Sequence, residues 1–370
     1  MIRKQRDLET ETVTRPQGTL ILQSMTRDGL ITRRRKYPMH SMTRNYWRIM
    51  ASPDGGLGAT GGLFFGAATV IRGNGSTVGA PTTTAIGFSH RAVAAAGQIW
   101  GVQVGTGATP MSLLDLGLDA RVPHGMSAGE LNYLESFATA TDLSLTAVRA
   151  FENLSGDTIN INEIALSAYR SGDGASQSHP YNYARDVLPE TFPLPNGEVA
   201  TATITISVSE GTRNMHRMFH PMTLSAGNWQ NTFYNRGGTT NIDYANRRTA
   251  KAPAGNDYGG ILLGTGDTEK GFTDIDLAER IPQGDAVGQL LYGATTDNIT
   301  ATQSSTEMSF QLQRTVMNDS PEPITVREMG LFAYNGTISY LLDRFILTTP
   351  IELAPAENRQ VRWLFRYTTA

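Results

Sequence analysis

The feature that most constrains this chain is an internal repeat. Similar tetrapeptides, V-G-T-G and L-G-T-G, occupy residues 104–107 and 263–266, a spacing of 159 residues. At this spacing residues 104–133 align with residues 263–292 without a gap, and 12 of the 30 pairs are identical. Chance at average composition gives about two identities. Because self-similarity at a fixed spacing is typical of repeated architectures, the sequence predicts a tandem duplication of one unit.

The match continues beyond this block, with six extra residues in the second copy, and returns to the first spacing near residue 185. The paired positions include Arg149/Arg314, Asn153/Asn318, Glu163/Glu328, Arg185/Arg344 and Leu188/Leu347. The resulting organisation is a basic N-terminal arm (1–50), a Gly-rich insert (51–94), a first repeat (95–210), a basic leader (211–254) and a second repeat (255–370).

Composition and periodicity predict an all-β fold. The 370 residues include 38 glycines and no cysteine, and charged residues make up only 18%. Segments such as 143–147, 202–208 and 361–367 alternate apolar and polar residues, as half-buried strands do. Clusters of Gly, Pro and Asn separate them. Short antiparallel strands with such turns predict a β-sandwich in each repeat. Only residues 112–118 and 273–278 have the pattern of short helical turns.

The charges are distributed unevenly. Residues 1–50 hold 11 Lys and Arg against 4 Asp and Glu, and residues 211–254 hold 6 against 1, although the whole chain has a formal charge of −3. Two basic leaders therefore alternate with two acidic repeats. No stretch approaches the roughly 18 apolar residues of a membrane span, and no apolar run follows the basic start, so we expect neither a signal peptide nor a membrane partner.

The repeated Gly-Thr-Gly turn does not fit the known phosphate-binding loops. A dinucleotide fingerprint needs a third glycine three residues after the second, where Pro110 and Glu269 stand, and a P-loop needs Gly-Lys-Ser/Thr. We interpret it as a tight turn that needs glycine. His216 and His220 have the spacing of two zinc ligands on a helix but lack the acid that accompanies such ligands in metalloproteases, so we predict no metal and no cofactor.

Charged residues interrupt the apolar alternation at equivalent places in both repeats. We predict cross-strand ion pairs between Glu163 and Arg149 and between Glu328 and Arg314. A glycosidase would instead need two carboxylates facing one cleft, and one Glu beside one Arg does not supply them. We therefore expect no catalytic residues and no enzymatic activity.

The basic run Arg33, Arg34, Arg35 and Lys36 has two interpretations. It has the charge to contact nucleic-acid phosphates, with neighbouring aromatic residues to stack on bases. The acidic repeats would repel nucleic acid, however, and favour basic arms that reach acidic surfaces of the same or neighbouring subunits. We predict an assembly arm and do not expect a nucleic-acid partner.

The order of these motifs resembles the β-sandwich structural proteins of tailed-bacteriophage virions. The resemblance covers residues 95–210 and 255–370, and Ile324 to Leu331, I-T-V-R-E-M-G-L, is its closest segment. It implies a non-enzymatic subunit of a neck, collar, tail or fibre, assembled in the host cytoplasm. Its expected partners are copies of itself and other virion proteins. The alternative is a carbohydrate- or receptor-binding fibre or decoration module that uses Trp47, Trp100 or Trp229; a cell-wall glycan hydrolase ranks third.

Overall fold

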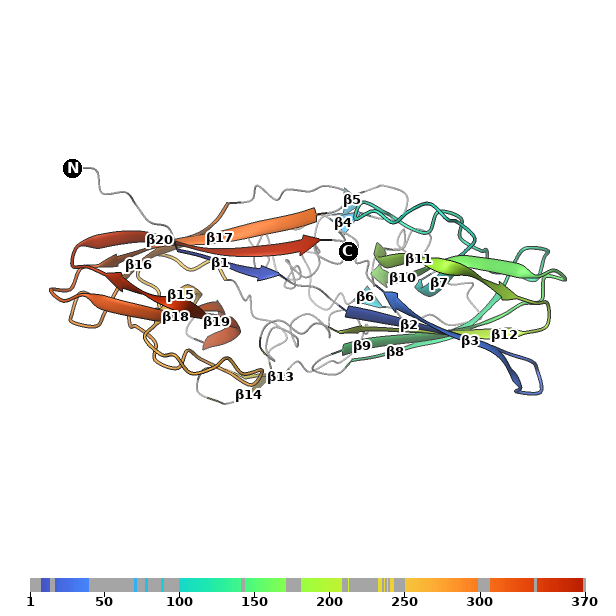
Figure 1. The fold of residues 1–370 in the computed structure, drawn as a ribbon, viewed down its shortest axis with the longest axis horizontal. Coiled ribbons are helices and arrows are strands. Elements are labelled where there is room, and N and C mark those ends of the chain that lie inside the picture. The colour runs from blue at the N-terminus through green and yellow to red at the C-terminus, as the bar shows by residue number, and fades with distance from the viewer. Residues whose placement is uncertain are drawn as a thin grey trace.

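The computed structural model shows an all-β protein (Figure 1). It describes residues 8–13, 17–39, 70–71, 77–78, 88–89, 100–140, 144–170, 181–207, 212, 232–234, 236, 238, 240–242, 250–298, 307–335 and 338–368. None of these residues is helical, so the expected helical turns at 112–118 and 273–278 are wrong. Both segments lie in loops that are held by hydrogen bonds from buried side chains, described below.

The first repeat contains six strands in two sheets. The strands are β7 (Gly101–Gly105), β8 (Asn132–Ala140), β9 (Ser144–Glu152), β10 (Ile159–Arg170), β11 (Tyr181–Leu194) and β12 (Val199–Ser207). β9 pairs antiparallel with β8 and β12, and β10 pairs antiparallel with β7 and β11. The two sheets have a β-sandwich-like arrangement, and their buried side chains belong to one hydrophobic core cluster.

The second repeat has the same strand order and the same pairing. Its strands are β15 (Gly260–Gly264), β16 (Leu291–Asn298), β17 (Glu307–Asn318), β18 (Ile324–Asn335), β19 (Ile338–Leu353) and β20 (Glu357–Thr368). β17 pairs with β16 and β20, and β18 pairs with β15 and β19. Tandem duplication is our interpretation of this correspondence.

The N-terminal arm adds strands to both repeats. β1 (Leu8–Val13) pairs parallel with β20, whereas β2 (Gln17–Met25) pairs antiparallel with β12. β3 (Ile31–Met39) then returns along the outer side of β2. The last strand of each repeat therefore receives its outer neighbour from one stretch of the chain, residues 8–25.

This arm fixes how the two repeats face each other. Val13 lies opposite Arg366 near the end of β20, and Gln17 lies opposite Ser207 at the end of β12. Four Cα steps separate Val13 from Gln17, a span of at most about 15 Å. The C-terminal ends of β12 and β20 therefore point toward each other, and Figure 1 shows the repeats at opposite ends of the long axis.

The described arm pairs with the chain's own sheets, which is the same-subunit placement of the two that the charge distribution allows. The cause is its period-two alternation: Leu20, Leu22, Tyr37 and Met39 are all at most 5% exposed and belong to the hydrophobic core. An apolar face of this kind is stabilised wherever a sheet offers an open edge over a core.

Short strands account for the remaining described segments. In the Gly-rich insert, β4 (Val70–Ile71) pairs with β5 (Thr77–Val78), and β6 (Phe88–Ser89) pairs with the end of β10. In the second leader, β13 (Thr232–Tyr234) pairs with β14 (Thr240–Ile242). Thr212 anchors the start of this leader, since its backbone N–H and hydroxyl donate to carbonyls of β19.

Candidate functional site

The Gly-Thr-Gly turn of the first repeat surrounds a buried carboxylate. Glu163 on β10 is fully buried. Its Oε1 accepts hydrogen bonds from the backbone N–H of Gly107 (3.2 Å) and of Ala120 (2.7 Å), and its Oε2 accepts one from Asp119 N–H (3.0 Å). A Cβ atom on Gly105 would lie 2.4 Å from Oε1. The first glycine therefore permits the close approach of this internal anion.

The second repeat builds the same arrangement around Glu328. The backbone N–H groups of Ala278 (3.1 Å) and Glu279 (2.8 Å) donate to its two carboxylate oxygens. A Cβ on Gly264 or Gly266 would lie 2.5 or 2.6 Å from Glu328 Oε1. The tetrapeptide is thus a loop shaped around a side chain of its own repeat.

The ion-pair partner of each buried Glu is an arginine of the neighbouring strand. Arg185 Nε on β11 lies 2.8 Å from Glu163 Oε2, and Arg344 Nε on β19 lies 2.6 Å from Glu328 Oε2. Burial alone would lower the pKa of Arg185, but its hydrogen bonds and charge interactions with Asp115 and Glu163 outweigh that effect and raise it.

Each of these arginines also holds the loop that follows the turn. Arg185 Nη1 lies 2.7 Å from Asp115 Oδ2, and its Nη2 donates to Thr109 O (3.0 Å). In the second repeat Arg344 contacts Asp274 (2.9 Å) and Thr268 O (2.8 Å) in the same way. These bonds fix the two segments that had the pattern of helical turns.

The expected pairs of Arg149 with Glu163 and of Arg314 with Glu328 are therefore wrong. Arg149 lies on β9, in the other sheet from Glu163, and donates to the carbonyls of Leu134 (3.0 Å), Trp100 (2.7 Å) and Val102 (3.4 Å). Arg314 likewise donates to carbonyls of residues 256, 259, 261 and 293. Both arginines are buried, and they bind backbone carbonyls.

A tyrosine packs against each of these carbonyl-binding arginines. The guanidinium carbons of Arg149 and Arg314 each lie 4.7 Å from the ring centroids of Tyr133 and Tyr292. Burial lowers the pKa of both arginines to about 10, so they remain charged at neutral pH. Each tyrosine hydroxyl donates to a loop carbonyl, Val122 O (2.7 Å) or Ile281 O (2.9 Å).

Tyr133 and Tyr292 should resist ionisation at alkaline pH, because burial raises the pKa of both to about 12. At pH 11 most tyrosines of ordinary pKa are ionised, so unfolding there in guanidinium should add tyrosinate absorbance near 295 nm. The double variant Tyr133→Phe/Tyr292→Phe should show a smaller increment. Since the folded pKa exceeds the unfolded one, the stabilisation from these hydroxyls is lost between about pH 10 and 12. An unchanged increment would contradict this assignment.

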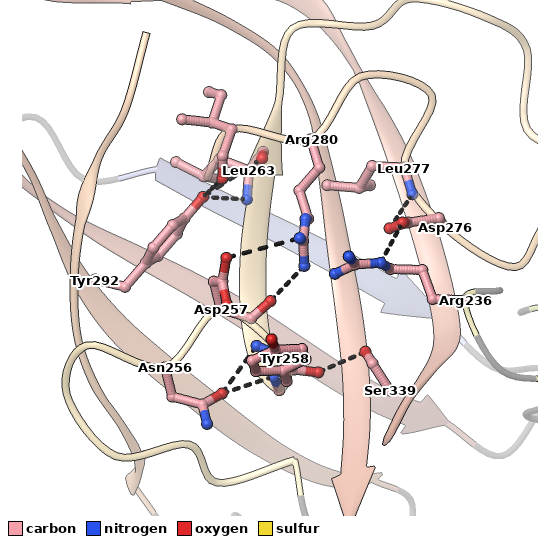
Figure 2. A network of polar contacts seen from close by, with 12 residues as sticks. Arg236, Asn256, Asp257, Tyr258, Leu263, Asp276, Leu277, Arg280, Tyr292 and Ser339 are labelled. Atoms are coloured by element: carbon pink, nitrogen blue, oxygen red, sulfur yellow. Dashed lines mark hydrogen bonds and ion pairs between the residues drawn. The ribbon is translucent and has the colours of Figure 1, made fainter. Parts of the chain in front are cut away.

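A further polar network, shown in Figure 2, occurs in the second repeat. Arg236 of the second leader pairs with Asp276 (Nε to Oδ2, 3.0 Å), and its backbone N–H donates to Ser339 O (3.1 Å). The Arg236 guanidinium carbon lies 5.9 Å from the ring centroid of Tyr258. Beside it Arg280 pairs with Asp257 (3.6 Å). Burial raises the pKa of Asp276 above its ordinary value.

This network fastens the second leader to its repeat and was missed in the sequence. The aligned positions in the first repeat hold Gly117 in place of Asp276, Gln98 in place of Asp257 and Ile99 in place of Tyr258. The signal for this network in the sequence is therefore a difference between the two repeats, and the identities between them do not carry it.

The basic run lies on β3, at the edge of the five-stranded sheet. Arg33 Nη1 donates to Pro193 O (2.7 Å). Arg35 Nε lies 2.7 Å from Glu190 Oε1, and the side chains of Arg35 and Glu190 are both at least half exposed. Arg34 and Lys36 occupy the alternate positions and are exposed. The run is thus divided between two residues that contact β11 and two that face outward.

The structure describes one of the remaining sequence candidates, Trp100. Trp100 is 5% exposed and packed in the first repeat, so it does not offer a face to a saccharide. Trp47, Trp229, His216 and His220 lie outside the described residues. Among the residues described, no group of three or more His, Cys, Asp or Glu side chains has the arrangement of a metal site, and no helix is long and apolar enough to cross a membrane.

Comparisons of the chain with family models, with curated proteins and with solved structures gave no match.

Proposed function

We propose that this protein is a non-enzymatic structural subunit of a tailed-phage virion, a neck, collar or tail component that assembles with copies of itself into a symmetric oligomer. The observation that carries the proposal is the N-terminal arm, which lends a strand to the outer edge of both repeats. Strand addition through an arm is a mode by which chains bind one another, because backbone hydrogen bonds supply the affinity.

The charge distribution supports the same role. Every charged side chain in the exposed class of the described second repeat is acidic: Asp267, Glu269, Glu279, Asp285, Asp319, Glu322 and Glu352. The arm exposes Arg34, Arg35 and Lys36 instead. Complementary surfaces of this kind favour contacts between copies. A subunit with two repeats also forms a ring with half as many chains as a single-repeat relative.

The first test is the mass of the untagged chain by light scattering at low and high salt. We expect a discrete multiple of 40.1 kDa that dissociates as salt screens the basic arm from the acidic surfaces. A second measurement, mass spectrometry of purified particles from the source of the sequence, should detect the chain as a regular virion component. A monomer at every salt and protein concentration would overturn self-assembly and give priority to the carbohydrate- or receptor-binding role.

A further inference from the structure

β1 and β3, the two strands of the N-terminal arm that lie farthest from the repeats' own strands, are each at the edge of a sheet. The five-stranded sheet has the order β3-β2-β12-β9-β8, and the four-stranded sheet has the order β1-β20-β17-β16. β3 pairs only with β2, and β1 pairs only with β20, over the part of the chain that the structure describes. The outer edges of β1 and β3 therefore carry backbone N–H and C=O groups that are available for pairing with another strand.

The two repeats differ in how many arm strands lie beyond their last strand. In the first repeat β3 covers the outer side of β2, whereas in the second repeat no described strand covers the outer side of β1. Among the described strands, the same edge position is therefore filled in one sheet and open in the other. One added strand beside β1 would give the second sheet the same number of strands as the first.

The sequences of the two edge strands are complementary in charge. β1 reads L-E-T-E-T-V and contains Glu9 and Glu11 with no basic residue. β3 reads I-T-R-R-R-K-Y-P-M and contains no acidic residue. Its exposed Arg34 and Lys36 stand two positions apart, as Glu9 and Glu11 do, and opposite charges on neighbouring strands stabilise their pairing.

We propose that β3 of one copy pairs edge to edge with β1 of a second copy, so that the five-stranded sheet of one chain continues into the four-stranded sheet of the next. This inference rests on the self-assembly proposed above and names its interface. The two surfaces are different, so the contact is head-to-tail and generates a closed ring or a filament.

The partner is a second chain because the geometry separates these strands within one chain. Arg34 lies opposite Gln23 and Lys36 lies opposite Ile21, so the two basic residues flank the middle of β2 and the half that is farther from β1 along the chain. β1 ends before β2 begins and lies on the other repeat. At the start of β3, Leu30 and Ile31 are 69% and 52% exposed, and a neighbouring chain would cover these two apolar side chains.

The chain has no cysteine, which permits a direct test by disulfide cross-linking. Full-length variants Glu9→Cys or Glu11→Cys are mixed in turn with Arg34→Cys or Lys36→Cys under a mild oxidant. A disulfide requires Cα atoms within about 7 Å, so we expect at least one of the four mixtures to form a covalent dimer. Thr203→Cys, on the half-exposed face of β12, is the matched control and should not cross-link with either β1 variant. Absence of a specific dimer from all four mixtures would overturn the interface.

Charge reversal tests the same contact without oxidation. Arg34→Glu/Lys36→Glu and Glu9→Lys/Glu11→Lys should each lower the mass of the assembly, and the chain carrying all four changes should recover it. Because Arg34 and Lys36 are exposed, we expect these variants to fold, and circular dichroism checks this. If Arg34→Ser/Lys36→Ser increases association, the charges keep the edge unpaired and the proposal is wrong. If the wild-type chain is a multimer but the cysteine variants do not cross-link and the charge reversals do not change the mass, this interface alone is overturned. If the wild-type chain is a monomer, the proposed self-assembly is overturned.

Discussion

Glu163→Gln is expected to lower the free energy of unfolding by about 3–5 kcal/mol, the usual effect of removing one partner from a buried ion pair. The carboxylate is fully buried and accepts from three backbone N–H groups and from Arg185. The amide keeps the size of the side chain, but it places an NH₂ group among donors and leaves the buried Arg185 with the partly exposed Asp115 as its one anionic partner among the ion pairs described. Denaturant unfolding followed by tryptophan fluorescence measures the change.

The matched control for this variant is Glu190→Gln. Glu190 also pairs with an arginine, Arg35, at 2.7 Å, but both side chains are at least half exposed. Exposed pairs contribute about 0–1 kcal/mol. Glu328→Gln should reproduce the larger effect in the second repeat. If Glu163→Gln and Glu190→Gln cost the same, the carboxylate does not hold the loop in the way that its hydrogen bonds indicate.

Sequence reasoning located the buried carboxylates but not their partners. Glu163 and Arg149 interrupt an apolar alternation, which marks them as buried polar residues, yet alternation gives no information about which sheet each strand joins. β9 and β10 are neighbours in the chain but belong to different sheets. The correct partner was visible in the repeat, because Arg185 and Arg344, Asp115 and Asp274, and Thr109 and Thr268 are all identical pairs.

The fold class was predictable from local sequence patterns, whereas the position of the arm depends on contacts between distant parts of the chain. Period-two alternation and Gly, Pro and Asn turns correctly predicted an all-β chain, since both are local properties. The pairing of β1 with β20 joins residues more than 350 positions apart, and nothing local to either strand specifies it. The placement of Arg236 on the second repeat depends on a similar long-range contact.

The second large effect is expected from Arg314→Met, which should lower the free energy of unfolding by about 2–4 kcal/mol. Arg314 is 1% exposed, and its hydrogen bonds to Gly293 O (2.8 Å), Gly259 O (2.9 Å) and Ile261 O (3.1 Å) join β15 to the opposite sheet. Methionine fills similar space but leaves these buried carbonyls without their donor, and each unsatisfied buried acceptor costs about 1–3 kcal/mol.

Lysine should not rescue this site, because a single ammonium group cannot reproduce the planar set of guanidinium donors that reaches carbonyls on two segments. Arg149→Met should have a similar effect in the first repeat, where the carbonyls of Trp100 and Val102 lose their donor.

Arg362→Met, on the half-exposed face of β20, is the control, and its effect should stay within about 1 kcal/mol. Since the pKa of Arg314 is lowered only to about 10, the cost should be constant from pH 6 to pH 8. A loss equal to that of Arg362→Met would show that β15 is held to the opposite sheet by apolar packing alone.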